Sequence, residues 1–207
     1  MSFIELLSKE ISDLPGEKAH KKFYPYRFEF YEKPLNTKLS AVGIHLFQMN
    51  SEWYFILIER SEYIGYHSKQ IAFPGGKKDP EDINLEHTAR RESYEEISIS
   101  MDSAFLIGQI TPVYIPASNF EVFPFIFFHK DLSKLCKSEK EVNEIIFVKC
   151  SDLVNDQNIS ITEVNEAENI KLKQIPCFIL NEKVVWGATA LILSEVREIL
   201  LRIKPYL

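Results

Sequence analysis

The most informative residues of this chain are Phe73-Pro74-Gly75-Gly76-Lys77-Lys78-Asp79 and, after a short loop, Arg91-Glu92-Ser93-Tyr94-Glu95-Glu96. In a helix, residues three and four positions apart are neighbours, so Glu92, Glu95 and Glu96 share one face. Closely packed carboxylates repel each other unless a cation lies between them, and a hard divalent cation such as Mg²⁺ takes oxygen ligands of this kind. Such a cation also binds phosphate oxygens and activates water for displacement at phosphorus. The stretch therefore predicts a metal-dependent site that cleaves a phosphoanhydride.

A solvated acidic helix face is the alternative interpretation, because most charged helix faces simply point to water. Three neighbouring features favour a site. The double glycine lies before the helix, where a tight backbone turn is useful. Arg91 places a cation directly beside Glu92. Asp82, one turn before the helix body, can pair with Arg91 and brace the loop.

The spacing resembles the Nudix box, G-x5-E-x7-R-E-U-x-E-E-x-G-U, and runs here from Gly76 to Asp82 and on to Arg91-Glu92. The chain departs from this pattern in four ways. Asp82 replaces the first Glu, one extra residue precedes Arg91, Ser93 replaces an aliphatic residue, and Ser98 replaces the last Gly. The first two departures look like one branch of the family, the coenzyme A pyrophosphatases, which has a Phe-Pro-Gly-Gly opening and a longer loop.

More of that branch's pattern is present along most of the chain. The similar segments are Leu57-Ile58-Glu59-Arg60-Ser61, residues 65–71, residues 111–125 and Val185-Trp186-Gly187-Ala188-Thr189-Ala190. The resemblance implies hydrolysis of the diphosphate of coenzyme A or acyl-CoA to 3′,5′-ADP and (acyl-)4′-phosphopantetheine. Many branch members have Arg in place of Gly65 and Gly in place of Lys69. Because a lysine does not reproduce the bidentate phosphate contact of an arginine, NADH, ADP-ribose or an oxidised nucleotide stay open as substrates.

Every metal position of the box carries a carboxylate here. The resemblance implies that Glu92, Glu95 and Glu96 bind Mg²⁺ or Mn²⁺, the expected cofactor. Glu92, Glu95 and Arg91 are the expected catalytic residues, with Arg91 orienting Glu92 or pairing with Asp82. A nucleotide-binding domain without catalysis is a further alternative, because a serine at position 98 can distort a helix end that often uses glycine.

The proton of the attacking water has two candidate acceptors. One is Glu92, and the other is a carboxylate from a loop outside the box. The polar segment that carries Glu163, Glu166 and Glu168 can supply such a carboxylate, although an exposed acidic loop explains the same residues.

The expected substrate contacts surround the glycine turn and extend into two other segments. They are Arg60, His67, Lys69, Gly75, Gly76, Lys77, Ser118 and Phe120. The glycines allow close backbone approach to metal or phosphate, and loops carry specificity. The alternatives are a plain loop for the glycines, a structural hydrogen bond for His67 and turn chemistry for Ser118-Asn119. His45 lies in the middle of a predicted strand and is expected to be structural.

Composition bounds the class of protein. The 207 residues fit one domain, 1–207, with an N-terminal helical extension over about 1–30. The net charge of −6 disfavours a nucleic-acid binder, and no apolar run is long enough to span a membrane. The N-terminus is unlike a secretory signal, and three widely spaced cysteines read as buried or semi-buried thiols of a reducing compartment, so we expect a cytoplasmic protein. The expected partner is a small CoA-like nucleotide substrate. The resemblance also allows a homodimer, because the family often forms dimers.

Hydrophobic patterning predicts the elements. Expected strands are 39–48 and 53–59 with a turn at Asn50-Ser51, then 104–110, 122–129, 144–149 and a hairpin over 175–185 that turns at Asn181-Glu182. Expected helices are 3–11, 85–97 with Asn84 as its N-cap, and 188–203, for which Thr189 is a candidate cap and Trp186 a core anchor. Pro124 indicates an edge strand or a bulge. The fold class is therefore α/β, and the resemblance implies a Nudix-type α/β/α sandwich with a mixed β-sheet.

Overall fold

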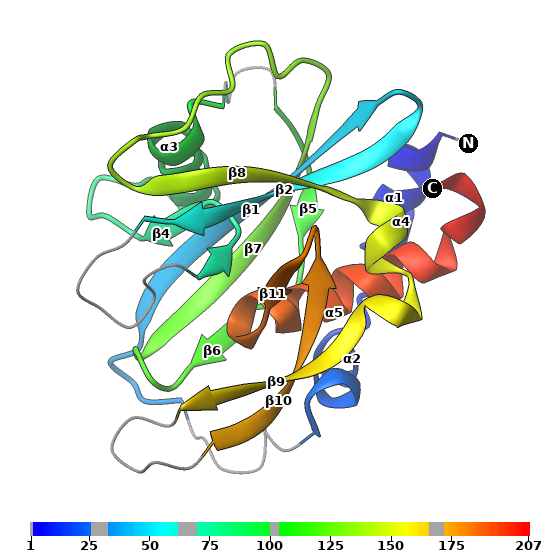
Figure 1. Cartoon of the computed structure of the whole chain (residues 1–207). Coiled ribbons are helices and arrows are strands. Elements are labelled where there is room, and N and C mark those ends of the chain that lie inside the picture. Colours follow the sequence, from blue (N-terminus) through cyan, green and yellow to red (C-terminus); the bar gives the residue numbers. More distant parts are fainter. Residues whose placement is uncertain (1, 26–32, 62–69, 100–103, 166–171) are drawn as a thin grey trace.

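The computed structural model describes residues 2–25, 33–61, 70–99, 104–165 and 172–207 (Figure 1). The helices are α1 (Phe3–Glu10), α2 (Glu17–Phe23), α3 (Leu85–Ile97), α4 (Cys150–Leu153), α5 (Gly187–Arg202) and the 3₁₀ turns η2 (Asp156–Asn158) and η3 (Lys204–Tyr206). The strands are β1 (Lys38–Met49), β2 (Glu52–Arg60), β3 (Ile71–Ala72), β4 (Gly75–Lys77), β5 (Phe105–Gln109), β6 (Val113–Ile115), β7 (Phe120–His129), β8 (Val142–Lys149), β9 (Ile159–Asn165), β10 (Leu172–Leu180) and β11 (Lys183–Val185).

The larger sheet is mixed, as predicted. Its strand order is β3-β2-β1-β7-β5, with β4 paired to β1, β6 to β7 and β8 to β2. The long central pair, β1 and β7, is parallel, and the other pairs in this sheet are antiparallel. A second sheet has the order β11-β10-β9.

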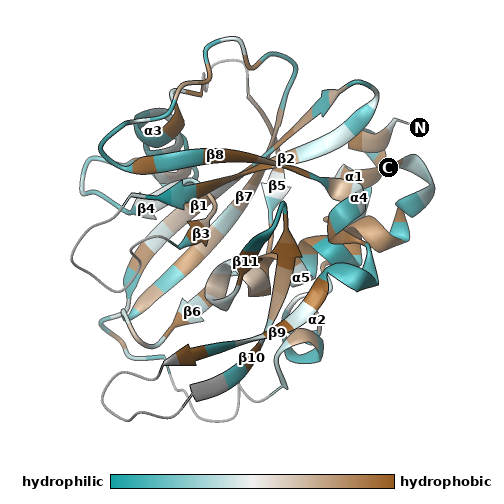
Figure 2. Ribbon diagram, viewed as in Figure 1, coloured by the Kyte–Doolittle hydropathy of each residue, from teal (hydrophilic) through white to brown (hydrophobic). Residues whose placement is uncertain are grey.

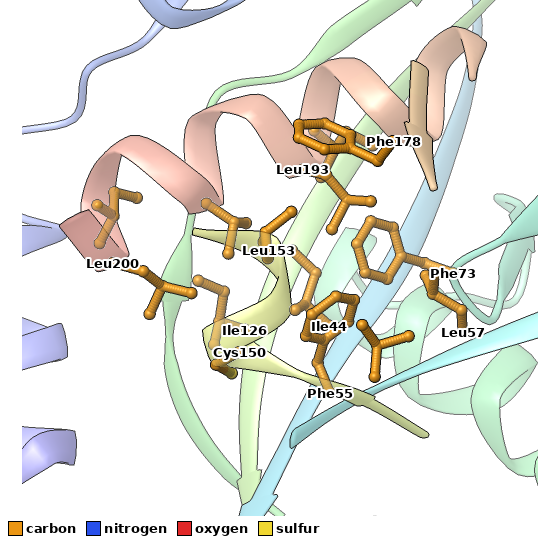
Figure 3. Packing of buried hydrophobic residues seen from close by; sticks show 14 of the residues in the cluster. Ile44, Phe55, Leu57, Phe73, Ile126, Cys150, Leu153, Phe178, Leu193 and Leu200 are labelled. Carbon is orange, nitrogen blue, oxygen red and sulfur yellow. The ribbon is translucent and has the colours of Figure 1, made fainter. Parts of the chain in front are cut away.

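The larger sheet is covered by helices on both faces, which confirms the predicted sandwich. Phe55 and Leu57 of β2 belong to the cluster that contains the buried side chains of α5, whereas Ile56 and Ile58 pack with Ile97 of α3. This alternation follows from the two-residue period of a strand. Figure 3 shows Phe55, Leu57 and Ile126 beneath Leu193 and Leu200 of α5. In Figure 2 the hydrophobic residues gather on the strands between α3 and α5, and the surrounding turns are mostly hydrophilic.

The start of α2 docks on α5 through a buried carboxylate. Glu195 of α5 is fully buried and accepts hydrogen bonds from the backbone N–H of Gly16 (2.8 Å), the backbone N–H of Thr111 (3.0 Å) and the Thr111 hydroxyl (2.7 Å). Such contacts compensate the desolvation of the carboxylate. In the described residues, we find no helix whose length and apolarity would let it cross a bilayer.

Elements with strong local signals lie where the sequence predicts them. Asn50 (φ 52°) and Ser51 (φ 66°) form the β1–β2 turn, and Asn181 (φ 48°) and Glu182 (φ 63°) form the β10–β11 turn, as in two-residue hairpins with positive φ. Helix α3 has the predicted bounds, and the Asn84 side chain accepts from the N–H of His87 at 2.8 Å. Helix α4 and strands β3, β4, β6 and β9 were not predicted, and α2 lies within the helical extension expected over about 1–30.

Three predictions about single residues are wrong. Pro124 is not on an edge strand: it lies in β7 next to β1, and it is tolerated because β6 pairs with β7 before it and β5 after it. An irregularity in the β5–β7 pairing follows nearby, between Leu106 and Gly108 of β5. Thr189 does not cap α5, whose N-cap is Trp186 without a side-chain hydrogen bond, and Trp186 is half-buried rather than part of the buried core. Cys136 is exposed, whereas Cys150 and Cys177 are buried.

Candidate functional site

The predicted site is a loop and a helix held against the start of β1. Strand β4 pairs with β1 through Gly75–Val42, Gly76–Ala41 and Lys77–Ser40. The loop after β4 leads into α3, and its helical turns bring the carboxylate face back toward Gly75 and Gly76. Two backbone features therefore place the acidic residues: the short β4 pairing and the capped start of α3 at Asn84.

The two glycines of the turn have different roles. Gly75 has φ +154°, and a Cβ built on it would lie 2.6 Å from the Cα of Val42, so a side chain would collide with the backbone of β1. At Gly76 the three nearest atoms belong instead to the Glu92 carboxylate. A Cβ built on Gly76 would lie 2.5 Å from the Cδ of Glu92. The missing side chain of Gly76 thus leaves the space that the Glu92 carboxylate occupies.

Arg91 joins the loop to the carboxylates. Its Nε and one Nη donate to the two oxygens of Asp82, both at 3.0 Å, and the same Nη donates to the carbonyl of Lys77 at 3.0 Å. The other Nη donates to Glu92 at 2.7 Å and to Glu95 at 3.2 Å. The predicted contacts of Arg91 with Asp82 and with Glu92 therefore exist together.

Asp82 is the buried carboxylate that holds Arg91 in place. Its carboxylate also accepts from the N–H of Asp79 and the hydroxyl of Thr88, each at 2.9 Å. The hydrogen bonds from Arg91 are the largest cause that holds the pKa of Asp82 well below its usual range, and Asp82 in turn raises the pKa of Arg91. A carboxylate that accepts several hydrogen bonds stays ionised, so this pair is charged throughout the physiological range.

Glu96 is the most buried of the three box carboxylates, with a side chain 1% exposed. Its Oε1 accepts from Arg60 at 2.8 Å and its Oε2 from the N–H of Gly75 at 2.8 Å. Burial raises the pKa of Glu96 to about 7, against the opposing effects of Arg60 and Gly75. Burial also raises the pKa of Glu92, whose side chain is 17% exposed, while that of Glu95 is 49% exposed. The exposure of the three carboxylates on this face of α3 therefore increases from Glu96 through Glu92 to Glu95.

The three glutamate carboxylates of α3 are suitable ligands for a hard divalent cation. In this structure they form ion pairs with Arg60 and Arg91 instead. Carboxylate oxygens are the ligands that Mg²⁺ and Mn²⁺ prefer. The close approach of the Glu92 carboxylate to Gly76 and the desolvation of Glu92 and Glu96 are consistent with a cation bound beside the turn. Within the described ranges, however, no three His, Cys, Asp or Glu side chains converge as a metal site in this conformation. Binding would require Glu92 and Glu96 to turn from their arginine partners.

Ser93, which departs from the aliphatic residue of the box, has a buried polar partner. Its hydroxyl donates to the carbonyl of Ala89 at 2.6 Å and lies 2.8 Å from Nε2 of His45. Since Ser93 has used its one proton, His45 donates through Nε2 and accepts through Nδ1 from His129, 2.9 Å away. Burial lowers the pKa of His45 well below its usual value and that of His129 to about 4, so both rings are neutral. His45 is structural, as predicted.

Ser98 takes the conformation that a glycine would take. Its φ of 52° and ψ of 26° are left-handed, and its N–H donates to the carbonyl of Tyr94 at 2.9 Å. The helix therefore ends normally, and the expected distortion is absent. The substitution costs backbone strain instead.

The other predicted contacts are spread around this centre. Lys77 is exposed and contributes its carbonyl to Arg91. Phe120 starts β7 beside Lys38, whose ammonium lies 5.4 Å from the ring centroid, and Ser118 is in the preceding turn. Among the described residues, the Ser118 hydroxyl has no hydrogen-bond partner, and the ring of Phe120 contacts Lys38 rather than the carboxylates. Gly65, His67 and Lys69 lie outside the described residues.

The loop carboxylate that the sequence suggests is not beside α3. Glu163 is exposed on β9 opposite Gln174, and Figure 1 shows β9 far from α3. Glu166 and Glu168 lie outside the described residues. The structure places Glu141 instead near Glu96, where its charge contributes to the raised pKa of Glu96. The N–H of Ser138, in the same turn, donates to the carbonyl of Glu96 at 2.8 Å. No sequence signal identifies Glu141, because its place depends on the pairing of β8 with β2.

Known proteins share this sequence pattern and this fold. The family profile described as NUDIX domain matches residues 37–172. Proteins named mitochondrial coenzyme A diphosphatase NUDT8 are 30% identical in Mus musculus and 31% identical in Homo sapiens, each over 137 residues and 65% of this chain. The matched region spans less than two thirds of their length, 64% and 57%. A solved Nudix hydrolase from M. Smegmatis, RenU, has a TM-score of 0.53 at 13% identity, covering 84% of this chain and 90% of that one, which is a likeness of fold.

Proposed function

Because this chain belongs to the Nudix family, we propose that it is a divalent-metal-dependent pyrophosphohydrolase whose substrate is coenzyme A or an acyl-CoA. One observation carries the proposal. The turn at Gly75-Gly76 and the face of α3 bring Glu92 and Glu96 to the same place, where Gly76 leaves room for the Glu92 carboxylate and the Gly75 N–H binds Glu96. A regular solvated helix face has no reason to be built against a glycine turn in this way.

Glu92, Glu95 and Glu96 would hold Mg²⁺ or Mn²⁺. When bound, such a cation neutralises phosphate charge and makes water a better nucleophile. The chain's own residues supply position and charge. Arg91, fixed by Asp82 and Lys77, orients Glu92 and Glu95, and Arg60 adds positive charge at the buried end of the face.

The proton of the attacking water needs an acceptor at this face. Glu92 is one candidate, since desolvation raises its pKa and makes it a stronger base than a solvated carboxylate. Glu141 is the candidate from outside the box, because its charge acts on Glu96 across the turn before β8. Replacing each by glutamine and comparing the loss of kcat separates the two.

Coenzyme A is the best-supported substrate. The Phe73-Pro74-Gly75-Gly76 opening, the longer loop and the Leu57–Ser61 segment resemble the coenzyme A branch, and two relatives are named as coenzyme A diphosphatases. The products would be 3′,5′-ADP and (acyl-)4′-phosphopantetheine. Gly65 and Lys69 favour a second candidate, another nucleoside diphosphate derivative such as NADH, ADP-ribose or an oxidised nucleotide.

The test is incubation of the protein with CoA and Mg²⁺ or Mn²⁺, with chromatographic separation of the products and Glu96→Gln as the control. Formation of 3′,5′-ADP that the substitution abolishes supports the reaction and the carboxylate face. Cleavage of ADP-ribose or NADH with intact CoA keeps the chemistry and refutes the substrate. If the whole panel stays intact while CoA raises the melting temperature in the presence of metal, the chain is a nucleotide-binding domain.

A further inference from the structure

Arg60 reaches the carboxylate face because of its place in the sheet. It ends β2, and Ile56 and Ile58, on the same face of that strand, pack with Ile97 of α3. The pairing of β2 with β8 then shifts, from Glu59 opposite Glu144 to Arg60 opposite Val142. Irregularities of this kind redirect a side chain and are frequent beside active sites. The guanidinium therefore emerges under α3 and donates to Glu96 at 2.8 Å.

Glu96 needs this partner in the absence of metal. Its side chain is 1% exposed, so water does not solvate the carboxylate, and the Gly75 N–H contacts the other oxygen. A buried carboxylate without a cation is strongly unfavourable. Arg60 supplies that cation, and with a side chain 26% exposed it keeps a route to solvent.

The second arginine of the site is held differently. Arg91 donates to both oxygens of Asp82 and to the carbonyl of Lys77, so its position does not depend on Glu92 or Glu95. A cation that approaches the face can take Glu92 and Glu95 while Arg91 stays in place. It cannot take Oε1 of Glu96 while Arg60 stays, because two cations at one oxygen repel each other in a poorly solvated site.

We propose that Arg60 is an exchangeable counter-ion of Glu96: it holds this carboxylate in the metal-free protein and leaves it when a divalent cation binds. This inference rests on the proposed function, in which Glu96 is a metal ligand. It makes metal binding an exchange of one cation for another. Arg60 thereby weakens metal binding and stabilises the empty site, which a residue that served the substrate alone would not do.

The first experiment measures binding of Mn²⁺ alone, from the EPR signal of the free ion, to the full chain and to Arg60→Gln near pH 8. We expect Arg60→Gln to bind Mn²⁺ on the order of tenfold more tightly, because the competing charge is gone. In EDTA its melting temperature falls by about 5 °C, and saturating Mn²⁺ raises it by more than in the original protein. Equal or weaker Mn²⁺ binding by Arg60→Gln overturns the proposal.

Lys183→Gln is the matched control. Lys183 pairs with Glu59 and Glu144, the neighbours of Arg60 on the same two strands, and its side chain is 31% exposed. Its ion pairs are with Glu59 and Glu144 and not with Glu96, so the variant should bind Mn²⁺ as the original protein does. If the original protein itself binds no Mn²⁺, the proposed metal-dependent function fails as well; if it binds and Arg60→Gln is unchanged, the counter-ion role alone fails.

The second experiment needs no variant. In protein labelled on arginine, NMR follows hydrogen exchange of the Arg60 and Arg91 guanidinium groups in EDTA and in saturating Mg²⁺. We expect exchange at Arg60 to accelerate about tenfold as its ion pair opens, and exchange at Arg91 to stay slow because Asp82 keeps it. Unchanged protection of Arg60 in saturating Mg²⁺ refutes the exchange.

Discussion

Replacing Gly76 with alanine perturbs the candidate active site without touching the core. The added Cβ would lie 2.5 Å from the Cδ of Glu92, whereas an ordinary contact begins at 3.4 Å, so the carboxylate must retreat by about 0.9 Å. Because this carboxylate is the far end of a flexible side chain, the retreat is possible without unfolding. A misplacement of about 1 Å at a catalytic group can reduce the rate about 100-fold, which corresponds to about 2.7 kcal/mol of transition-state stabilisation.

Gly75→Ala is the matched comparison. Its Cβ would meet the backbone of β1, including the Cα of Val42 at 2.6 Å, and its φ of +154° is unfavourable for any residue with a side chain. We expect Gly75→Ala to lower the free energy of unfolding by about 3 kcal/mol or more, and Gly76→Ala to change it by less than about 1 kcal/mol.

The assays are guanidinium unfolding and kcat/KM on the substrate that the panel identifies. Gly76→Ala should unfold like the original protein and lose about 100-fold in kcat/KM. If it keeps more than about a third of kcat/KM, the space at Gly76 is not required by Glu92. If it is as unstable as Gly75→Ala, the assignment of separate roles to the two glycines is wrong.

Three further predictions concern stability. Ser98→Gly should raise the free energy of unfolding by about 0.5–1 kcal/mol, since Ser98 has φ 52°; an equal or lower value in urea unfolding contradicts the strain. Asp82→Asn should lower the free energy of unfolding by about 3 kcal/mol, because Arg91 loses its buried partner. Asp79→Asn, which removes an exposed partner of Arg91, is the comparison, and an equal loss in the two variants contradicts this prediction. His129, whose pKa burial lowers to about 4, binds its proton more readily in the unfolded chain, so its contribution is present above about pH 6.5 and is lost as the pH falls toward 4. Between pH 7 and pH 5 the original protein should therefore lose about 2 kcal/mol more than His129→Gln, and equal losses refute this.

Local signals were sufficient for the longer helices, for most of the longer strands and for the acidic face. Asn84 caps α3, positive-φ turns join β1 to β2 and β10 to β11, and the i, i+3, i+4 spacing aligns the carboxylates, all through contacts within a few residues. Such contacts are visible in a sequence because the backbone alone sets their geometry. The resemblance to the Nudix box added the family and the α/β sandwich.

The wrong predictions concern residues whose environment is set by contacts between distant parts of the chain. Pro124 was expected at an edge or a bulge, and it lies inside the sheet where the partner of β7 changes from β6 to β5. Thr189 was a candidate cap for a helix whose N-cap is Trp186. Both depend on which segments become neighbours. The charge of Glu141, in the turn before β8, acts on Glu96, while Glu163, one of the loop carboxylates that the sequence offered beside Glu92, lies on another sheet.

The chain's own pattern is enough to predict the groups that would carry the proposed chemistry: three glutamates on one helix face, a glycine turn and an arginine among acids. Their electrostatic state follows from packing. Glu96 is desolvated because α3 lies against the sheet, and it is paired because β2 ends in Arg60 under that helix. Ser93 is compatible with a buried helix face because His45, 48 residues away, meets it there. Burial and long-range pairing are properties of the assembled chain, since a sequence window contains neither the second surface nor the distant partner.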